Sequence, residues 1–359
     1  MKKWIFLMFA LLVLTVPTQA AEVPQELTDA LPERAEALLE DVDPSDVQGF
    51  DRGVSHLLEG LLGQVSTILR QRLRGAASVL LVVVLCGAVD GFYQGTGSDK
   101  VTVFLPMAGA LSVTLATAGS LDTLIGLGAE TIEELNVFSK ALLPTLAAAT
   151  AASGAVTTAT FQQVTTVFLA DLLLNLINDL LLPLVYLYIG VLTASACLPE
   201  NRLGALAEGL KKGITWILTT ALLLFTVYLS VARVISGAAD GATVKVAKAA
   251  ISGVVPVVGS IISEAAETVL AGAGLLKNTI GVFGMLAILA ACAYPFLQLG
   301  VQYLLYKLTA VLAATVGAPS LCKLIDGLGG AFGLVLGMTG SCALLLLISV
   351  LSSVAAVMP

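Results

Sequence analysis

Residues 79–89, VLLVVVLCGAV, and residues 341–358, SCALLLLISVLSSVAAVM, contain no charged side chain. Runs of this kind are typical of helices that cross a membrane, whereas strands of a membrane β-barrel alternate apolar and polar residues over about 10 positions. The whole chain has the same character: of its 359 residues, 57% are hydrophobic and 12% are charged, with a mean hydropathy of +0.97. A water-soluble domain has about 25% charged residues. The sequence therefore predicts an all-α, polytopic helical membrane protein.

The membrane domain is expected to cover residues 75–359. A helix needs about 20 mainly apolar residues to cross the hydrocarbon, and about 7–10 segments of this domain qualify. The expected spans are 75–95, 101–121, 141–160, 164–182, 184–198, 214–234, 251–273, 279–297, 299–317 and 331–356. The stretch that holds the spans 279–297 and 299–317 contains Pro295, so these two form either one kinked helix or two separate helices.

The first twenty residues have the three parts of a signal peptide. Lys2 and Lys3 form the positive end, residues 5–16 form the apolar middle, and residues 18–20 fit a cleavage site after Ala20. An uncleaved first anchor is the alternative. In both cases the segment that follows, residues 21–74, is expected outside the cytosol.

The extracytosolic segment has two parts. Residues 22–51 carry ten acidic residues and one arginine, Arg34. Residues 53–74 form an amphipathic helix, because leucine, isoleucine and valine recur there at helical spacing opposite a polar face. This helix can lie on the membrane surface, dock onto a partner helix, or pack on its own membrane domain; the sequence leaves all three open.

The positive-inside rule orients part of the membrane domain. Arg202, Lys211 and Lys212 fit a cytosolic loop, and residues 122–140, with four acidic residues, fit a loop on the outside. The arginines of residues 70–74 lie on the unfavoured side of the first span if the signal is cleaved. An amphipathic helix held at the outer surface, with its arginines against lipid phosphates, resolves that conflict.

One expected span, DLLLNLIND (171–179), has a polar face. At 100° per residue, Asp171, Asn175, Asn178 and Asp179 fall within an arc of about 100°. A charge at the membrane centre costs about 2.5–3.5 kcal/mol on insertion scales. This face is therefore expected to turn inward, towards a partner or water.

A second span, GVVPVVGSIISEAAETVL (253–270), combines a polar face with a break. Ser260, Ser263, Glu264 and Glu267 also lie within an arc of about 100°. Pro256 and Gly259 are expected to break this helix, as Pro144 and Pro295 are in two other spans. Broken helices in membranes are buried in protein or line a wet cavity.

Three interpretations of the two polar faces stay open. Their carboxylates can pair with cations on other helices, namely Arg233, Lys245, Lys248 or Lys277. They can line a polar pathway or pore, or they can form a contact with another subunit. None of the three requires a cofactor.

Several other functions lack their sequence signals. The chain has no basic patch with interleaved aromatic residues, which argues against a nucleic-acid partner. The five cysteines stand singly in apolar sequence and His56 is the only histidine, so no metal or cofactor site and no catalytic triad is expected. Phosphate-binding and hydrolase motifs are also missing. The sequence predicts a protein that is not an enzyme.

Two long segments carry a resemblance to a known family. They are SKALLPTLAAATAASGAVTTATFQQV (139–164) and KAAISGVVPVVGSIISEAAETVLAGAGLLKN (248–278). Together with the order of signal peptide, acidic segment, amphipathic helix and glycine-rich membrane domain, they resemble stage III sporulation protein AE of endospore-forming bacteria. The resemblance runs collinearly from about residue 50 to the C-terminus.

The resemblance implies a place in a complex. Members of this family belong to a set of eight proteins made in the mother cell, which assemble in the membrane that engulfs the forespore. With a forespore membrane protein, the set is thought to form a channel or secretion-like conduit that supports forespore development. The implied partners are the lipid bilayer, the other stage III sporulation membrane proteins and a secretion-type ATPase, with residues 21–74 in the intermembrane space. The alternative is a stand-alone ion-coupled transporter with a polar path through broken helices.

Overall fold

The computed structural model describes residues 23–39, 49–94, 99–198, 203–254, 259–316 and 319–355, and within these every regular element is a helix. The expected signal peptide, residues 1–20, lies outside the described residues. Two short helices come first, α2 (Gln25–Asp29) and α3 (Glu33–Leu39). The long elements are α4 (Gly49–Gln94), α5 (Asp99–Ala152), α6 (Val156–Asn175), the π-helix η1 (Leu176–Leu181), α7 (Leu182–Cys197), α8 (Gly204–Val254), α9 (Gly259–Ala314) and α10 (Pro319–Ala355).

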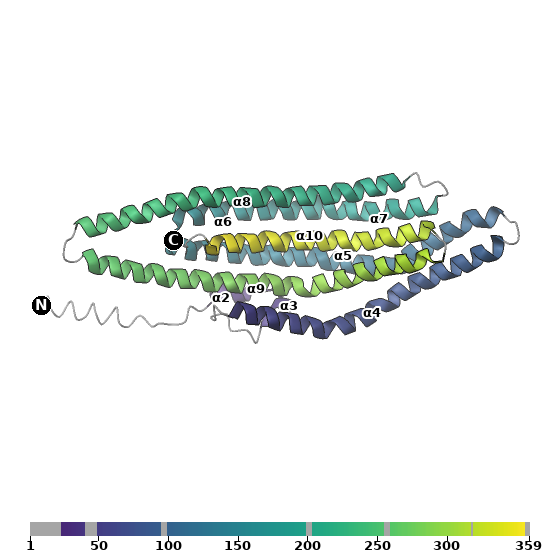
Figure 1. Ribbon diagram of the computed structural model, residues 1–359, viewed down its shortest axis with the longest axis horizontal. Coiled ribbons are helices and arrows are strands. Elements are labelled where there is room, and N and C mark those ends of the chain that lie inside the picture. Colours follow the sequence, from purple (N-terminus) through teal and green to yellow (C-terminus); the bar gives the residue numbers. More distant parts are fainter. Residues whose placement is uncertain are drawn as a thin grey trace.

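The helices form an elongated bundle in which consecutive long rods run antiparallel (Figure 1). The α4–α5 hairpin extends beyond the bundle at one end, and the α8–α9 hairpin extends beyond it at the other. Helix α9 has 56 residues and is therefore about 84 Å long at 1.5 Å per residue. The hydrocarbon core of a bilayer is about 30 Å thick, so the longest helices must also pass through or beside material other than lipid tails.

Six helical stretches of the described residues are long and apolar enough to cross a membrane: Phe50–Phe92, Phe104–Ala152, Gln163–Cys197, Gly204–Val231, Gly274–Ala314 and Pro319–Val354. This confirms the helical membrane class. Most of the expected hydrophobic segments fall in these six helices, and several of them join, but the segment 251–273 lies outside all six. The segment 279–297 and residues 299–314 of the next segment lie in α9. The segment 164–182 and residues 184–197 lie in the continuous rod of α6, η1 and α7.

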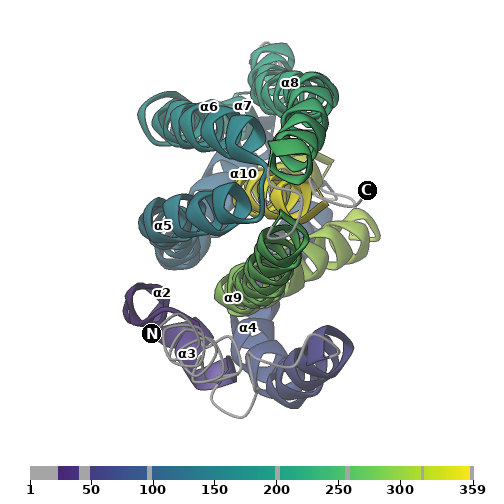
Figure 2. The same ribbon diagram turned by 90° about the vertical axis from the view of Figure 1, so that its left-hand side faces the viewer.

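Helix α10 lies at the centre of the bundle, with α5, α6, α7, α8 and α9 around it (Figure 2). Glycines of α10 let α9 approach closely, because Gly333 and Gly340 lie under aromatic rings of α9 and Gly329 lies against the Cβ atom of Tyr306. A Cβ on Gly329, Gly333 or Gly340 would meet Tyr306, Tyr303 or Phe296 at 3.1 Å. In lipid, such close packing supplies much of the attraction between helices.

Prolines do not interrupt the helices at two of the expected breaks. Pro144 lies inside α5, so the predicted break there is wrong, and Pro295 lies inside α9, so of the two alternatives at this proline the structure has the single helix. Each proline removes one backbone hydrogen bond. The burial of the neighbouring residues Leu142 and Leu299, both 0% exposed, favours the continuous helix over a break.

The true end of α5 lies eight residues after Pro144. Gly154 has a φ of 96°, a left-handed conformation that glycine adopts without steric cost. The amide of Ala155 donates to the carbonyl of Thr150 (3.2 Å), and that of Gly154 donates to the carbonyl of Ala151 (3.0 Å). These two bonds form a Schellman cap. The expected span 141–160 is therefore the end of one helix, a turn and the start of another.

The expected span 251–273 is also divided, since α8 ends at Val254 and α9 begins at Gly259. The expected outer loop 122–140 lies in the middle of α5.

The amphipathic helix 53–74 continues without interruption into the first membrane segment as α4. Its residues Leu57 and Ile68 are buried, so one edge of it packs on its own bundle.

Candidate functional site

The predicted polar face of DLLLNLIND begins with an ion pair between two helices. Lys140 Nζ of α5 lies 3.7 Å from Asp171 Oδ1 of α6, and the side chains are 53% and 49% exposed. Lys140 was not among the cations expected to pair with this carboxylate. Of those cations, Lys277 is buried in α9, and the side chains of Arg233, Lys245 and Lys248 lie outside the described residues.

The rest of this face points away from the bundle. Asn175 and Asp179 are exposed and Asn178 is half-buried. The opposite side of the same rod is apolar and packs inside the bundle, through Leu173, Leu174, Ile177 and Leu181. The expectation that the polar face turns inward is therefore wrong for this chain alone, because leucines already occupy the inner side. In a membrane the face still requires water or another protein.

The π-helix η1 changes the direction of Asp179. The amide of Leu182 donates to the carbonyl of Ile177, five residues back, because Pro183 has no amide to donate to Asp179. A π turn takes more residues than an α turn, so each residue turns through less than 100°. Asp179 is thereby rotated back towards the line of Asp171 and Asn175. π-Helical turns inside α-helices are frequent at functional sites.

Helix α5 adds a further acid beside this face. Glu133 is exposed and lies seven residues before Lys140, so both side chains project from the same side of α5. Helix α5 packs along α6. We call Glu133, Lys140, Asp171, Asn175 and Asp179 the polar face of the α5–α6 hairpin. It carries three carboxylates and one ammonium on the outside of the bundle.

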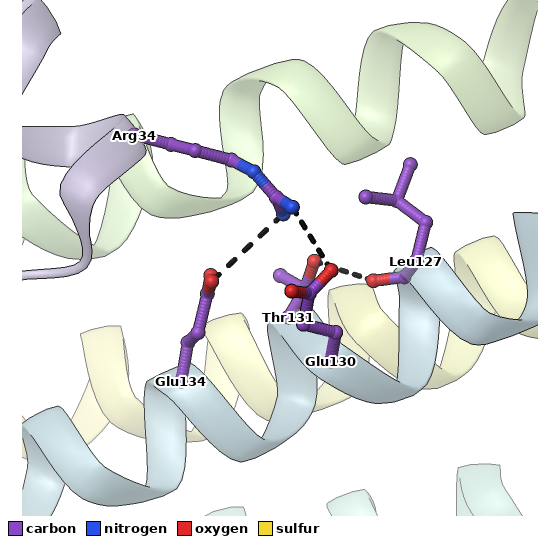
Figure 3. Close-up of polar contacts among 5 residues, drawn as sticks. All are labelled: Arg34, Leu127, Glu130, Thr131 and Glu134. Atoms are coloured by element: carbon purple, nitrogen blue, oxygen red, sulfur yellow. Dashed lines mark hydrogen bonds and ion pairs between the residues drawn. The ribbon is translucent and has the colours of Figure 1, made fainter.

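Neighbouring acids of α5 hold the N-terminal segment. Arg34 of α3 donates to Glu130 Oε2 at 2.9 Å and lies 3.9 Å from Glu134 Oε1 (Figure 3). Burial lowers the pKa of Arg34, but the hydrogen bond to Glu130 and the charges of both glutamates outweigh it, so the net pKa is raised. Arg34 is the lone cation of the acidic stretch 22–51, and its ion pairs link α3, which packs mainly on α9, to α5.

The sequence analysis missed a row of polar residues inside the bundle. Gln298, Gln302 and Tyr306 are buried at intervals of four residues on one side of α9. Arg72 of α4 donates to Gln298 Oε1 at 2.6 Å, and Tyr306 donates to Thr117 Oγ1 of α5 at 3.1 Å. The signal was present in the spacing of the two glutamines within QLGVQYLLY. The row joins α4, α5 and α9 through polar contacts.

The second predicted polar face cannot be placed from side chains. Ser260, Ser263, Glu264 and Glu267 lie in the first turns of α9, but their side chains are outside the described residues, and so is Pro256. Gly259 is the first residue of α9. The three interpretations of this face therefore stay predictions. Within the described part of the chain, no three His, Cys, Asp or Glu side chains are grouped to hold a metal ion.

Comparisons with known proteins agree with the resemblance. Residues 45–357 match the family model of stage III sporulation protein AE. The chain is also 25% identical over 253 residues to "Stage III sporulation protein AE" of Bacillus subtilis (strain 168). That match covers 69% of this chain and 62% of the relative, so it spans a little less than two thirds of the relative's length. No solved structure matches significantly.

Proposed function

Since the chain belongs to the stage III sporulation protein AE family, we propose that it is a membrane subunit of a channel or secretion-like complex linking mother cell and forespore. In this proposal it has no enzymatic activity of its own and is needed for forespore development. Its site is the engulfing membrane of the mother cell. Its partners are the other stage III sporulation membrane proteins and a secretion-type ATPase, and residues 21–74 face the intermembrane space.

One observation supports a subunit over a protein that works alone. The polar face of the α5–α6 hairpin is exposed on the outside of an apolar bundle, and its carboxylates Asp171 and Asp179 lie within a candidate membrane span. Lipid tails solvate carboxylates poorly, so this face is stable in a membrane only against another protein or a wet passage. A subunit of a conduit offers both.

The charge distribution supports the orientation. Lys211, Lys212 and Lys323 lie near the end of the bundle where α7 is followed by α8 and α9 by α10 (Figure 1). By the positive-inside rule this end faces the cytosol of the mother cell. A cytosolic ATPase would meet the chain there.

Cysteine labelling tests the role of the polar face. In a variant without the five native cysteines, Asn175→Cys and Asp179→Cys are treated with a small, polar, membrane-impermeant thiol reagent. Leu172→Cys is the matched control, because Leu172 is 54% exposed on the same rod but lies beside the polar face. Each variant is labelled twice, in sporulating cells with the full set of partners and in cells that make this chain alone.

The labelling pattern separates the proposal from its rivals. If positions 175 and 179 line a conduit, they are expected to react with the reagent in sporulating cells. If they contact a partner, they are expected to react in cells that make this chain without its partners and to be protected in sporulating cells. Equal, slow labelling of positions 172, 175 and 179 under both conditions would contradict the proposal, because it would place all three against lipid.

Purification through a C-terminal tag from sporulating cells gives the second test, since recovery of the chain without other subunits in several mild detergents would favour the transporter.

A stand-alone ion-coupled transporter remains the second candidate. It is favoured by the same exposed carboxylates, which would carry the coupling ion. In that case the isolated chain in vesicles is expected to move a substrate or an ion without partners. The subunit proposal expects no such transport.

A further inference from the structure

A cleft of about 1400 Å³ opens at the end of the bundle where α7 ends and α10 begins. Its walls come from α7, α8, the last turns of α9 and the first turns of α10. The cleft is separate from the polar face of the α5–α6 hairpin and shares no residue with it. It has a charged part and an apolar part, and each part suits a different half of one ligand.

In the charged part, two ammonium groups have no ion-pair partner among the described residues. Of the lining residues, Lys212 pairs with Glu208 at 3.7 Å. The lining carboxylate of Asp326 is held by Lys307 of α9. This leaves Lys211 and Lys323, which also line the cleft, without an ion-pair partner among the described residues.

Lys211 is positioned inside the cleft rather than in free solution. Its Nζ atom lies 3.1 Å from the point where a Cβ of Gly330 would stand, and Tyr188 Oη lies 3.3 Å from that point. The Tyr188 hydroxyl donates to the carbonyl of Gly327 at 3.0 Å. Because Gly330 has no side chain, the ammonium of Lys211 reaches from α8 to the surface of α10. A charge held there, half-buried, is available to an anion that enters the cleft.

The apolar part opens to the outside of the bundle. Leu198, Trp216 and Val311 line it and are 47%, 69% and 66% exposed. An exposed tryptophan beside lysines is typical of the membrane–water interface. The lysines lie at the end that the positive-inside rule assigns to the cytosol, where anionic lipids attract basic groups.

We propose that this cleft binds an anionic phospholipid, with its phosphate between Lys211 and Lys323 and an acyl chain along Leu198, Trp216 and Val311. Two ammonium groups without an ion-pair partner among the described residues favour an anionic head group over a zwitterionic one. The apolar wall accounts for a lipid rather than a free phosphate. An acidic peptide would use the ammonium groups but leave the apolar wall unexplained.

Fluorescence quenching tests this assignment directly. The chain contains two tryptophans, Trp4 and Trp216, so a full-length Trp4→Phe variant has Trp216 as its only reporter. The variant is placed in phosphatidylcholine nanodiscs that contain a small mole fraction of phosphatidylglycerol with brominated acyl chains. Brominated phosphatidylcholine at the same mole fraction is the lipid control.

We expect brominated phosphatidylglycerol to quench Trp216 at about 25-fold lower mole fraction than brominated phosphatidylcholine, since two lysines contribute. Lys211→Gln and Lys323→Gln should each weaken this preference about fivefold, and the double variant about 25-fold, at roughly the contribution of one lysine near a membrane surface. Lys212→Gln is the matched control. It lies next to Lys211 but is paired with Glu208, so the preference should stay within about twofold.

Four outcomes would overturn the proposal. Equal quenching by the two lipids would show that the cleft does not select an acidic head group. An unchanged preference in the double variant would place the lipid elsewhere. An equal loss in Lys212→Gln would indicate a general surface charge instead of a site. Loss of quenching on addition of inorganic phosphate or of an acidic peptide at millimolar concentration would identify a site for a soluble anion.

Discussion

The guanidinium of Arg72 in α4 donates a hydrogen bond of 2.6 Å to Gln298 Oε1 in α9. Arg72 was expected to meet lipid phosphates at the outer surface, together with Arg70 and Arg74. Instead it is half-buried between two helices, while its two neighbours in that cluster remain exposed. The bond joins the amphipathic helix 53–74, as part of α4, to α9, the longest of the described helices.

Replacement of Arg72 should therefore destabilise the protein, whereas replacement of its neighbours should not. Arg72→Leu leaves a buried glutamine unpaired and is expected to cost about 1.5–3 kcal/mol of unfolding free energy. Arg70→Leu is the control and should change it by less than about 0.5 kcal/mol. Unfolding in mixed micelles with increasing denaturing detergent measures both.

A double variant separates the hydrogen bond from the packing of the side chain. Arg72→Leu with Gln298→Leu removes both partners and should cost less than the sum of the single changes, because no buried polar group is left alone. Strict additivity of the two single effects would show that the bond contributes nothing to stability.

The contact of Arg34 with Glu130 should help to hold α3 on the bundle, where it packs mainly on α9. Arg34→Gln and Glu130→Gln each remove a partly exposed ion pair worth about 0.2–1 kcal/mol. Because α3 has only 7 residues, a loss of this size should loosen it. We expect faster cleavage of residues 23–39 by added protease, with unchanged cleavage in the exposed control Glu36→Gln.

Charge reversal gives the matching rescue. Arg34→Glu alone should increase protease sensitivity further, because it places a third carboxylate beside Glu130 and Glu134. Adding Glu130→Arg should restore protection. If the double reversal stays as sensitive as the single variant, apolar contacts rather than the ion pair hold α3 in place.

Alanine substitutions at two glycines, one inside α5 and one just after it, should change the stability of the protein in opposite directions. Gly154 has a φ of 96°, so Gly154→Ala is expected to cost about 1–2 kcal/mol. Gly119 lies inside the same helix with open space where a Cβ would stand, so Gly119→Ala should gain about 0.5–1 kcal/mol. The midpoint of thermal unfolding in detergent reports both. An unchanged midpoint in Gly154→Ala would contradict the cap at Gly154, and a loss in Gly119→Ala would contradict the open space at that position.

Apolar sequence predicted the class of this fold well, because only helices satisfy the backbone inside a bilayer. It predicted the boundaries of the helices poorly, because the long helices of this bundle stay apolar beyond the thickness of a membrane. Residues 53–74 and 75–94 read as two elements by composition but form the single helix α4. The turn at Gly154 lies in a run of small residues that gives no clear signal, and the break was predicted at Pro144 instead.

The arrangement of the polar residues was predicted only in part, because the sequence of one helix does not show how it faces the others. Helical spacing grouped Asp171, Asn175 and Asp179 correctly on one side of their rod, but periodicity gives no direction relative to other helices. The leucines between them decided that direction by packing on the core. The hydrogen bond from Arg72 to Gln298 joins residues 226 positions apart, and a single sequence holds no information on such a pair.

The direction of Asp179 gives the sharpest test of the polar face. Because Pro183 cannot donate to the carbonyl of Asp179, the chain takes a π turn there. Pro183→Ala restores the missing amide, so we expect η1 to become α-helical and Asp179 to rotate away from Asp171 and Asn175. Stability should stay the same or rise, since a proline is removed from a helix. If the aligned carboxylates serve the complex, the yield of heat-resistant spores should fall although the protein accumulates normally.

The control for this change is Pro144→Ala, which removes a proline from α5 where no π turn follows. It should leave the spore yield unchanged. Asp179→Asn, which keeps the shape of the side chain but removes its charge, should reproduce the loss seen with Pro183→Ala. If Pro183→Ala and Asp179→Asn both sporulate as well as the unmodified protein, neither the π turn nor the carboxylate of Asp179 matters to the complex. The polar face would then be a packing surface whose charge is incidental.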